Sequence, residues 1–154
     1  MSSLSPILSV TKSKEKPMKI FQIFLDGIDK TGKDLIRSYI FYLAKGRYIC
    51  VARGYASMVV YSNLYDRPYE YDMTTQSICL NVLLEVDKDD WEIRCKNSNE
   101  PLTNYEAEVI AFRNVFTELE QSGYHTLRFN TSRVTPFSIA KAIIRYMEKI
   151  NGSH

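Results

Sequence analysis

One short segment places glycine and lysine at the spacing of a phosphate-binding loop. Residues 27–33 read GIDKTGK and match the pattern G-x-x-x-x-G-K. Gly27 and Gly32 let backbone amides turn toward phosphate oxygens, and a helix that begins at Lys33 adds a favourable dipole. The lysine supplies a positive charge for the β- and γ-phosphates. The competing interpretation is a plain glycine-rich turn between a strand and a helix. The candidate binding residues are Gly27, Asp29, Lys30, Thr31, Gly32, Lys33 and Asp34.

The residue after Lys33 bears on metal binding. The pattern usually has Ser or Thr there, whose hydroxyl binds Mg²⁺, whereas this chain has Asp34. A carboxylate can bind Mg²⁺ directly or through water, although it also brings negative charge toward the phosphates. Asp34 is therefore the candidate metal ligand.

Composition limits the class of protein. The chain has 154 residues, of which 45% are hydrophobic and 25% charged, and its net charge is +2. It contains no apolar run of the roughly 18 residues that cross a bilayer, so we expect no membrane partner. The small net charge argues against a dedicated nucleic-acid binder on electrostatic grounds. Three widely spaced cysteines without a CxxC pair favour a reducing, cytoplasmic location, which for a viral protein is the host cytoplasm.

The phosphate-loop segment lies in a chain that alternates strand and helix patterns. Short apolar runs predict buried strands, and longer runs with one apolar face predict helices. The expected strands are residues 19–25, 48–51, 78–86 and 125–129. The expected helices begin at Lys33, Ala56, Asp87, Tyr105 and Thr135, with Thr135-Pro136 as a cap and first-turn proline.

The apolar spacing also predicts which helix side chains are buried. The expected core residues are Leu35, Ile36, Tyr39, Ile40, Tyr42 and Leu43 in the first helix, Val109, Ile110, Phe112, Val115, Phe116 and Leu119 in the fourth, and Phe137, Ile139, Ala140, Ile143, Ile144, Met147 and Ile150 in the last. Lys33 lies outside the apolar face of its helix. We therefore expect it to be a surface residue whose ammonium faces the anion site.

The alternation of strands and helices predicts the fold class. It is typical of an α/β protein with a parallel sheet, here of about four core strands, joined by helical crossovers. Ligands of such sheets bind at the carboxyl ends of the strands. The loops after Leu25, Val51, Val86 and Phe129 are therefore where we expect the chemistry.

Several segments together resemble a known family. Residues 25–34, LDGIDKTGKD, resemble the P-loop of thymidylate kinases and related deoxynucleoside or nucleoside monophosphate kinases, especially phage-encoded ones. Residues 51–57 and 60–62, VARGYAS and VYS, look like the family's Asp-Arg-x-x-x-Ser…Tyr segment. Residues 83–87 and 91–94, LLEVD and WEIR, look like its strand and lid helix, and residues 129–132, FNTS, like the loop near the adenine.

This resemblance implies a fold, an activity and residue roles. The fold would be a three-layer sandwich of the P-loop NTPase type. The activity would be ATP- and Mg²⁺-dependent phosphoryl transfer to a nucleotide such as dTMP. Lys33 and the loop amides would hold the donor triphosphate, Arg53 the acceptor monophosphate, and Arg94 would cover the transferred group. For Arg53, the competing interpretation is a solvated surface arginine.

The chain departs from the family in ways that bear on activity. Ala52 stands where the family has Asp or Glu, a carboxylate that positions the acceptor phosphate and the metal. The chain is also shorter than typical members, and Arg94 and Lys96 are the remaining lid cations. Any turnover is therefore expected to be weak. The alternative function is a catalytically degenerate P-loop protein that acts as a binding or structural subunit.

A second alignment of the chain with the family's motifs is possible. In it, Arg53 matches the arginine after the family's second strand, and Asp66-Arg67 serves as the Asp-Arg pair. The stretch between Val51 and Asp66 is short for a helical crossover followed by another strand, which favours the first alignment.

The sequence predicts one domain with an N-terminal extension. Residues 1–17 are rich in Ser, Thr and Pro and contain KSKEK, so we expect a flexible tail. Residues 18–154 would form a single P-loop kinase-like domain. By resemblance we expect a homodimer, through the Tyr39 and Tyr42 side of the first helix and the tyrosine-rich helix at 55–65. Tyr48, Tyr55, Tyr61, Tyr65, Tyr69 and Tyr71 concentrate around the expected acceptor side.

Overall fold

The observed elements alternate as the sequence predicts. The computed structural model describes residues 19–68 and 79–152, so the predicted tail at 1–17, Tyr69 and Tyr71 lie outside the described residues. The elements are β1 (Gln22–Asp26), α2 (Lys33–Ala44), β2 (Ile49–Ala52), α3 (Tyr55–Tyr65), β3 (Cys79–Glu85), α4 (Lys88–Asn97), α5 (Tyr105–Gln121), β4 (Thr126–Asn130) and α6 (Pro136–Ile150). Each predicted strand and helix is confirmed to within a few residues.

A parallel sheet organises the molecule. Its four strands have the order β2-β1-β3-β4, and all three pairings are parallel. Leu25 of β1 is in register with Ala52 of β2 and with Val82 of β3. The carboxyl ends of the strands therefore meet at one edge, and the loops that follow them lie side by side.

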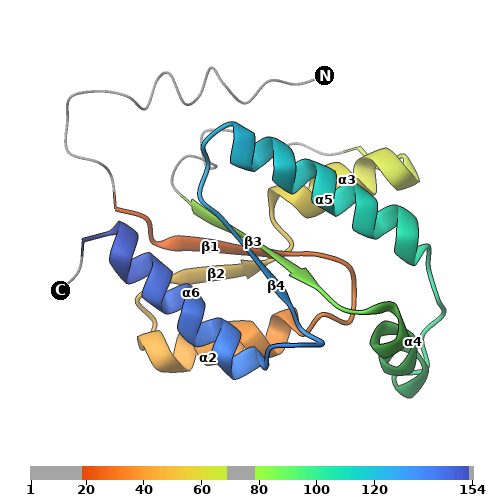
Figure 1. Ribbon diagram of the computed structural model, residues 1–154, viewed down its shortest axis with the longest axis horizontal. Coiled ribbons are helices and arrows are strands. Elements are labelled where there is room, and N and C mark those ends of the chain that lie inside the picture. The colour runs from red at the N-terminus through yellow and green to blue at the C-terminus, as the bar shows by residue number, and fades with distance from the viewer. Residues whose placement is uncertain (1–18, 69–78, 153–154) are drawn as a thin grey trace.

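Helices cover both faces of the sheet. α2 and α6 pack on one face, and α3 and α5 pack on the other (Figure 1). The side chains of β3 serve both faces: Leu80, Val82 and Leu84 belong to the cluster under α2 and α6, whereas Leu83 belongs to the cluster under α3 and α5. The result is a three-layer α/β structure with one apolar cluster on each side of the sheet.

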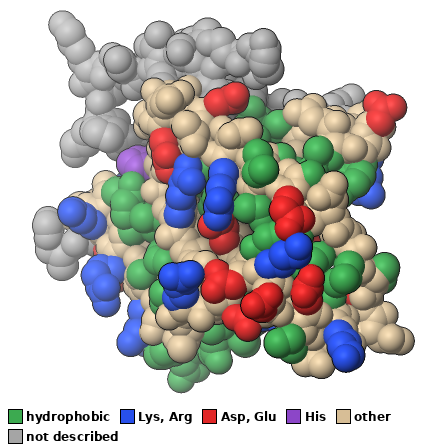
Figure 2. Space-filling view, turned by 45° about the vertical axis from the view of Figure 1, so that its right-hand side comes forward, with side chains coloured by type: hydrophobic (Ala, Val, Ile, Leu, Met, Phe, Trp, Pro, Cys, Tyr) green, Lys and Arg blue, Asp and Glu red, His purple; other side chains and the backbone are tan. Residues whose placement is uncertain are grey.

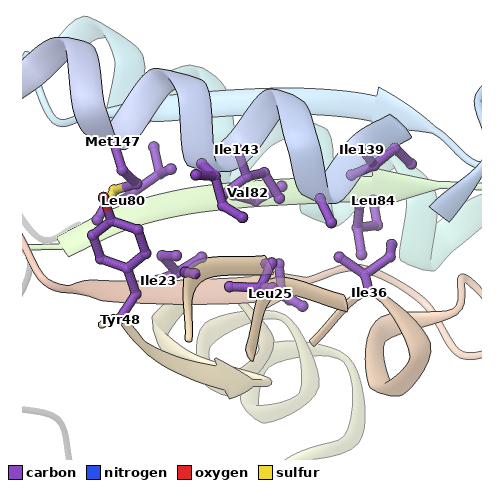
Figure 3. Close-up of a cluster of buried hydrophobic side chains, with 14 of the residues drawn as sticks. Ile23, Leu25, Ile36, Tyr48, Leu80, Val82, Leu84, Ile139, Ile143 and Met147 are labelled. Atoms are coloured by element: carbon purple, nitrogen blue, oxygen red, sulfur yellow. The ribbon is translucent and has the colours of Figure 1, made fainter. Parts of the chain in front are cut away.

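The cluster under α6 shows how the layers interlock (Figure 3). Side chains from α6 meet those of the central strands without exposure to solvent, and Ile36 of α2 closes the cluster from the side. The buried residues include Ile23, Leu25, Leu80, Val82, Leu84, Ile139, Ile143 and Met147. Close-packed burial of this kind is the main stabilising contribution to such a domain.

Some helix side chains that the spacing assigns to the core are exposed instead. Leu35 is 48% exposed, Tyr42 74%, Ile110 57% and Phe137 39%. The prediction is wrong at these positions because the buried face of the helix is narrower than the apolar spacing suggests. In α2, for example, only every fourth residue, Ile36, Ile40 and Ala44, forms the fully buried apolar row. The exposed Tyr42 leaves the expected homodimer surface available, and the dimer stays a prediction.

At the amino edge of the sheet, one side chain joins α6 to β1 by hydrogen bonds. Asn151, just after α6, accepts a hydrogen bond from Ile20 N at 2.7 Å through Oδ1, and its Nδ2 donates to Ile20 O at 2.8 Å. This amide joins the end of α6 to the start of β1. No helix in the described residues is long and apolar enough to span a membrane.

Two residues of α5 test the burial pattern. Leu119 is fully buried, so Leu119→Ala is expected to lower the free energy of unfolding by about 2–5 kcal/mol. The exposed Ile110→Ala is the matched control and should change it by about 0.5 kcal/mol or less. Urea denaturation of both variants measures the difference, and equal losses would contradict the observed orientation of α5.

Candidate functional site

The predicted phosphate loop forms one wall of a cavity at the carboxyl edge of the sheet. The loop joins β1 to α2, and the cavity beside it has a volume of about 350 Å³. Residues 29–35 line it together with Ala52, Arg53 and Glu100. The cavity thus brings together every predicted binding residue except Gly27, and it includes Arg53 but not Arg94. Acidic and basic side chains lie close to one another on the side of the molecule shown in Figure 2.

Gly27 is required by close packing at the start of this loop. Its φ is +139°, and a Cβ atom there would lie 2.1 Å from the carbonyl oxygen of Leu84 in β3. Any other residue would therefore collide with backbone. The loop begins tightly against the neighbouring strand, which fixes where its amides point.

Lys33 is folded into the loop rather than extended into solvent. Its Nζ donates to Ile28 O at 2.6 Å and to Thr31 Oγ1 at 3.1 Å, and Thr31 Oγ1 itself donates to Ile28 O at 3.1 Å. Lys33 is only 7% exposed, so the expectation of a surface residue is wrong. Burial, aided by the charge of Arg53, lowers the pKa of the Lys33 amine to about 8. An anion at the loop would favour the protonated amine.

Asp29 and Arg53 form an ion pair across the cavity. Arg53 Nη2 lies 2.6 Å from Asp29 Oδ1, and each side chain is about half exposed. Burial works to raise the pKa of Asp29, but the hydrogen bond and charge of Arg53 outweigh it and hold that pKa below its usual value. Arg53 follows β2 directly and has a left-handed φ of 72°. The arginine is therefore aimed at the phosphate loop and is not a free surface residue.

Arg94 contacts the backbone of the phosphate loop. Its Nη1 donates to Lys30 O at 2.7 Å and to Thr131 Oγ1 at 3.1 Å. Lys30, for its part, forms an ion pair with Glu100 at 2.6 Å. Arg94 thus joins α4, the phosphate loop and the loop after β4. Its contact with a transferred phosphoryl group stays a prediction.

Hydrogen bonds join the loops that follow β3 and β4. Asn130 Nδ2 donates to Asp87 Oδ1 at 2.9 Å, and Asp87 N donates to Ser132 Oγ at 2.9 Å. Asp87, where the sequence predicts a helix to begin, occupies the N-cap position of α4, but its side chain makes no capping hydrogen bond. The carboxylate is used instead to hold the β4 loop near the cavity.

Asp26 is a site residue that the sequence analysis missed. It ends β1 and is fully buried, and its Oδ1 accepts from Gly54 N at 2.8 Å, Ser57 N at 3.0 Å and Ser57 Oγ at 2.5 Å. Its Oδ2 is buried without a hydrogen-bond partner among the described residues. An acidic residue between an apolar strand and Gly27 was the available signal. The carboxylate ties the start of the phosphate loop to the segment that carries Arg53.

A second cavity adjoins the first. It has a volume of about 580 Å³ and shares Asp29 and Arg53 with the phosphate-loop cavity. Its other lining residues are Tyr61, Tyr65, Arg67, Thr103, Asn104 and Glu108. Of the clustered tyrosines, Tyr48 and Tyr55 are buried in the core, so only Tyr61 and Tyr65 of the described ones face this space.

The positions of Asp66 and Arg67 bear on the second alignment. Asp66 ends helix α3, and Arg67 follows it, so neither residue follows a strand. Arg53, by contrast, comes directly after β2. Both alignments place Arg53 after a strand, but the second also needs a strand before Asp66, and only α3 lies between Arg53 and Asp66. That Ala52 stands in the place of the family's carboxylate stays a prediction.

The side chains around the loop could supply a carboxylate to a metal ion whose other ligands are phosphate oxygens and water. No group of three or more His, Cys, Asp or Glu residues that could hold a metal ion occurs within residues 19–68 and 79–152. Asp34 lines the cavity, is 87% exposed at its side chain and lies 3.5 Å from Arg37. Mg²⁺ commonly takes one or two carboxylates and completes its shell with phosphate oxygens and water. The residues present fit that arrangement.

The environment of Asp26 predicts a pH effect on stability. Burial raises the pKa of Asp26 above its usual value, despite the opposing hydrogen bonds from Ser57. The folded state then holds this proton more tightly than the unfolded chain, so the carboxyl costs stability as pH rises above about 4. The free energy of unfolding of wild type minus that of Asp26→Asn should decrease between pH 4 and pH 8 in urea titrations. A difference that grows with pH would contradict this assignment.

Comparison with known proteins supports the fold. No protein-family model matches the chain, and no curated protein shows significant similarity to it. Among solved structures, it is similar to the YorR protein from Bacillus subtilis in complex with phosphorylated GDP, with a TM-score of 0.71 and 16% identity. The match covers 86% of this chain and 99% of that chain. At this identity the likeness shows the fold alone, and it confirms the three-layer α/β sandwich with a parallel sheet.

Proposed function

We propose that the protein binds a nucleoside triphosphate at the phosphate loop and transfers its γ-phosphoryl group to a nucleoside monophosphate in the adjoining cavity. The observation that carries the proposal is the shared wall between the two cavities. Asp29 and Arg53 line both of them, so two anionic ligands would meet at this pair. ATP is the proposed donor, and dTMP is one acceptor that the family resemblance suggests.

Each cation near the loop has a proposed role. Lys33 and the amides of residues 29–33 would bind the β- and γ-phosphates, because they border the same cavity. Arg53 would bind the acceptor phosphate, since a guanidinium donates to two phosphate oxygens at once. Arg94 would hold the loop in place and stabilise charge on the transferred group. Asp34 would bind Mg²⁺, which supplies charge neutralisation of the phosphates when it is present.

The transfer itself needs little covalent chemistry from the protein. An oxygen of the acceptor phosphate would form a bond to the γ-phosphorus, while the bond from that phosphorus to the β,γ-bridging oxygen breaks. A nucleoside diphosphate forms on each side. Positioning and electrostatic stabilisation provide most of the catalysis in such reactions. The paired arrangement of Lys33 and Arg53 around one cavity supports this assignment.

The similar solved structure supports a nucleotide ligand. YorR, whose fold this chain shares, was solved with phosphorylated GDP. The resemblance of residues 25–34 to the thymidylate kinase P-loop supports the same class of ligand. Both considerations favour nucleotide binding over an unrelated anion.

A second candidate function rests on Ala52. This residue lines the phosphate-loop cavity, and it offers no group to bind a metal or position an acceptor. By the family resemblance, it would stand in the place of a carboxylate. A protein that binds the nucleotide without turning it over, and acts as a binding or structural subunit, agrees with that feature. Incubation with ATP, Mg²⁺ and each common monophosphate, followed by measurement of ADP, separates the two functions.

Lys33 provides the test of nucleotide binding. ATP at about 100 times its dissociation constant should stabilise the wild type by roughly 2.7 kcal/mol, and Lys33→Ala should lose this stabilisation. Because the pKa of Lys33 is about 8 in the free protein, binding at pH 8.5 should take up a proton, and affinity should fall as pH rises through 8. Calorimetry in buffers of different ionisation enthalpy measures the uptake.

The exposed Lys149→Ala, on α6, is the control for loss of a positive charge. It should keep both the stabilisation and the proton uptake. If ATP, GTP, ADP and pyrophosphate all leave the wild-type melting temperature unchanged, with and without Mg²⁺, the proposed function is wrong.

Ala52 provides the test of catalysis. Ala52→Asp should raise the rate of ADP formation in the presence of Mg²⁺ and a monophosphate, because it restores a carboxylate in the wall of the cavity. The fold of the variant is checked by circular dichroism. An unchanged or lower rate in a folded variant would mean that Ala52 does not stand in the metal-positioning place.

A further inference from the structure

A buried carboxylate forms part of the second cavity. Glu108 lies in the first turn of α5, is 4% exposed and lines the cavity. Its Oε2 accepts a hydrogen bond from the hydroxyl of Tyr65. This hydrogen bond raises the pKa of Tyr65 to about 12.

Glu108 lacks a cationic partner in the described structure. Within residues 19–68 and 79–152, no lysine, arginine or histidine forms an ion pair with it. An ionised carboxylate offers about four acceptor sites, and Tyr65 fills one. Because Glu108 lines the cavity, a ligand that brings N–H donors can occupy the acceptor sites that Tyr65 leaves open.

Aromatic rings form the adjacent surface. The rings of Tyr61 and Tyr65 lie 6.0 Å apart between centroids and 22° from parallel, and Tyr61 meets Phe112 edge-to-face at 5.8 Å. Flat aromatic surfaces of this kind stack on planar ring systems. The cavity therefore combines aromatic side chains with an acceptor. Arg53, at its boundary with the phosphate loop, and Arg67, which lies 5.8 Å from the centroid of the Tyr65 ring, provide cations.

The hydrogen-bonding edges of the bases distinguish among possible ligands. Guanine presents two adjacent donors, N1–H and N2–H₂, which match the two oxygens of a carboxylate. Thymine and uracil present a single N3–H between two carbonyl oxygens, which a carboxylate repels. Adenine and cytosine each present one amino group beside a ring-nitrogen acceptor. A carboxylate thus favours guanine over the other bases.

We propose that Glu108 selects the base of the acceptor nucleotide and that this base is guanine. The inference rests on the proposed function, because it takes the second cavity as the monophosphate site. It replaces the dTMP suggested by family resemblance with a guanine nucleotide. Tyr65 acts as a positioning residue that holds the carboxylate in the cavity.

Calorimetric binding of GMP, IMP and dTMP tests the inference. IMP is the sharpest probe because it keeps N1–H and lacks the amino group at position 2. We expect the wild type to bind GMP roughly tenfold or more tightly than IMP, and dTMP more weakly still, as for loss of a hydrogen bond to a charged group. Glu108→Gln should reduce the GMP preference over IMP to about threefold or less, because one acceptor oxygen becomes a donor.

Two matched variants complete the design. Glu106→Gln removes an exposed carboxylate on the same helix, one that pairs with Lys88, and it should keep the GMP preference. Tyr65→Phe removes the hydroxyl that holds Glu108 and keeps the ring. It should lower the GMP preference over IMP, but less than Glu108→Gln does, because both oxygens of Glu108 remain as acceptors. Thermal unfolding checks that each variant folds.

The outcomes separate this inference from the proposed function. If monophosphates bind and the wild type does not prefer GMP to IMP, the role of Glu108 is overturned while the proposed function stands. The same holds if folded Glu108→Gln retains the full preference. If no nucleotide binds to the wild type at all, both are overturned. If Glu108→Gln fails to fold, the ratio of GMP affinity to IMP affinity in the wild type decides the inference.

Discussion

Hydrogen bonds to Asp26, at the end of β1, hold the segment between β2 and α3 in place. They position most of the candidate site. One carboxylate oxygen receives three hydrogen bonds, from the amides of Gly54 and Ser57 and the hydroxyl of Ser57. Gly54 must be a glycine for this approach, because a Cβ atom there would lie 2.4 Å from the ring of Phe24. Since Arg53 immediately precedes Gly54, this contact sets the arginine opposite the phosphate loop. The two cavities meet where they do because this buried acid holds their walls together.

The cations around the loop already have partners in the protein. Lys33 donates to Ile28 and Thr31, Arg53 pairs with Asp29, and Lys30 pairs with Glu100. An arriving phosphate must therefore compete with oxygens of the protein rather than meet free charges. This exchange limits the net gain from each contact, and it gives Asp29 and Glu100 a part in setting the affinity for anions.

Local patterns were enough to predict the elements and the loop between β1 and α2. Apolar runs identified β1 and β3, and the cap at Thr135-Pro136 is confirmed by the bond from Ser138 N to Thr135 Oγ1 at 3.2 Å. The same reasoning failed where burial depends on a neighbouring layer. Ile110 and Leu35 carry apolar side chains at suitable spacing, yet both are about half exposed within the described part of the chain.

The chemistry of the missed residues also depends on tertiary contacts. Lys33 is buried because the loop folds around its amine, which spacing along a helix does not show. Glu108 shares the i, i+4 row of Phe112 on α5, so the pattern alone marks it as a charged residue on an apolar face. Its partner Tyr65 comes from a different helix, 43 residues away in the sequence. Only the assembled fold brings these two side chains to one cavity.

The Asn151 amide that joins α6 to the start of β1 has a consequence for how this fold can vary. It lies at the amino edge of the sheet, whereas the phosphate loop and both cavities lie at the carboxyl edge. A substitution of Asn151 therefore acts on the joining of α6 to β1, at the edge away from the cavities, whereas Ile20 takes part only through its backbone N and O. The joining of α6 to β1 and the candidate chemistry thus lie at opposite ends of the same strands.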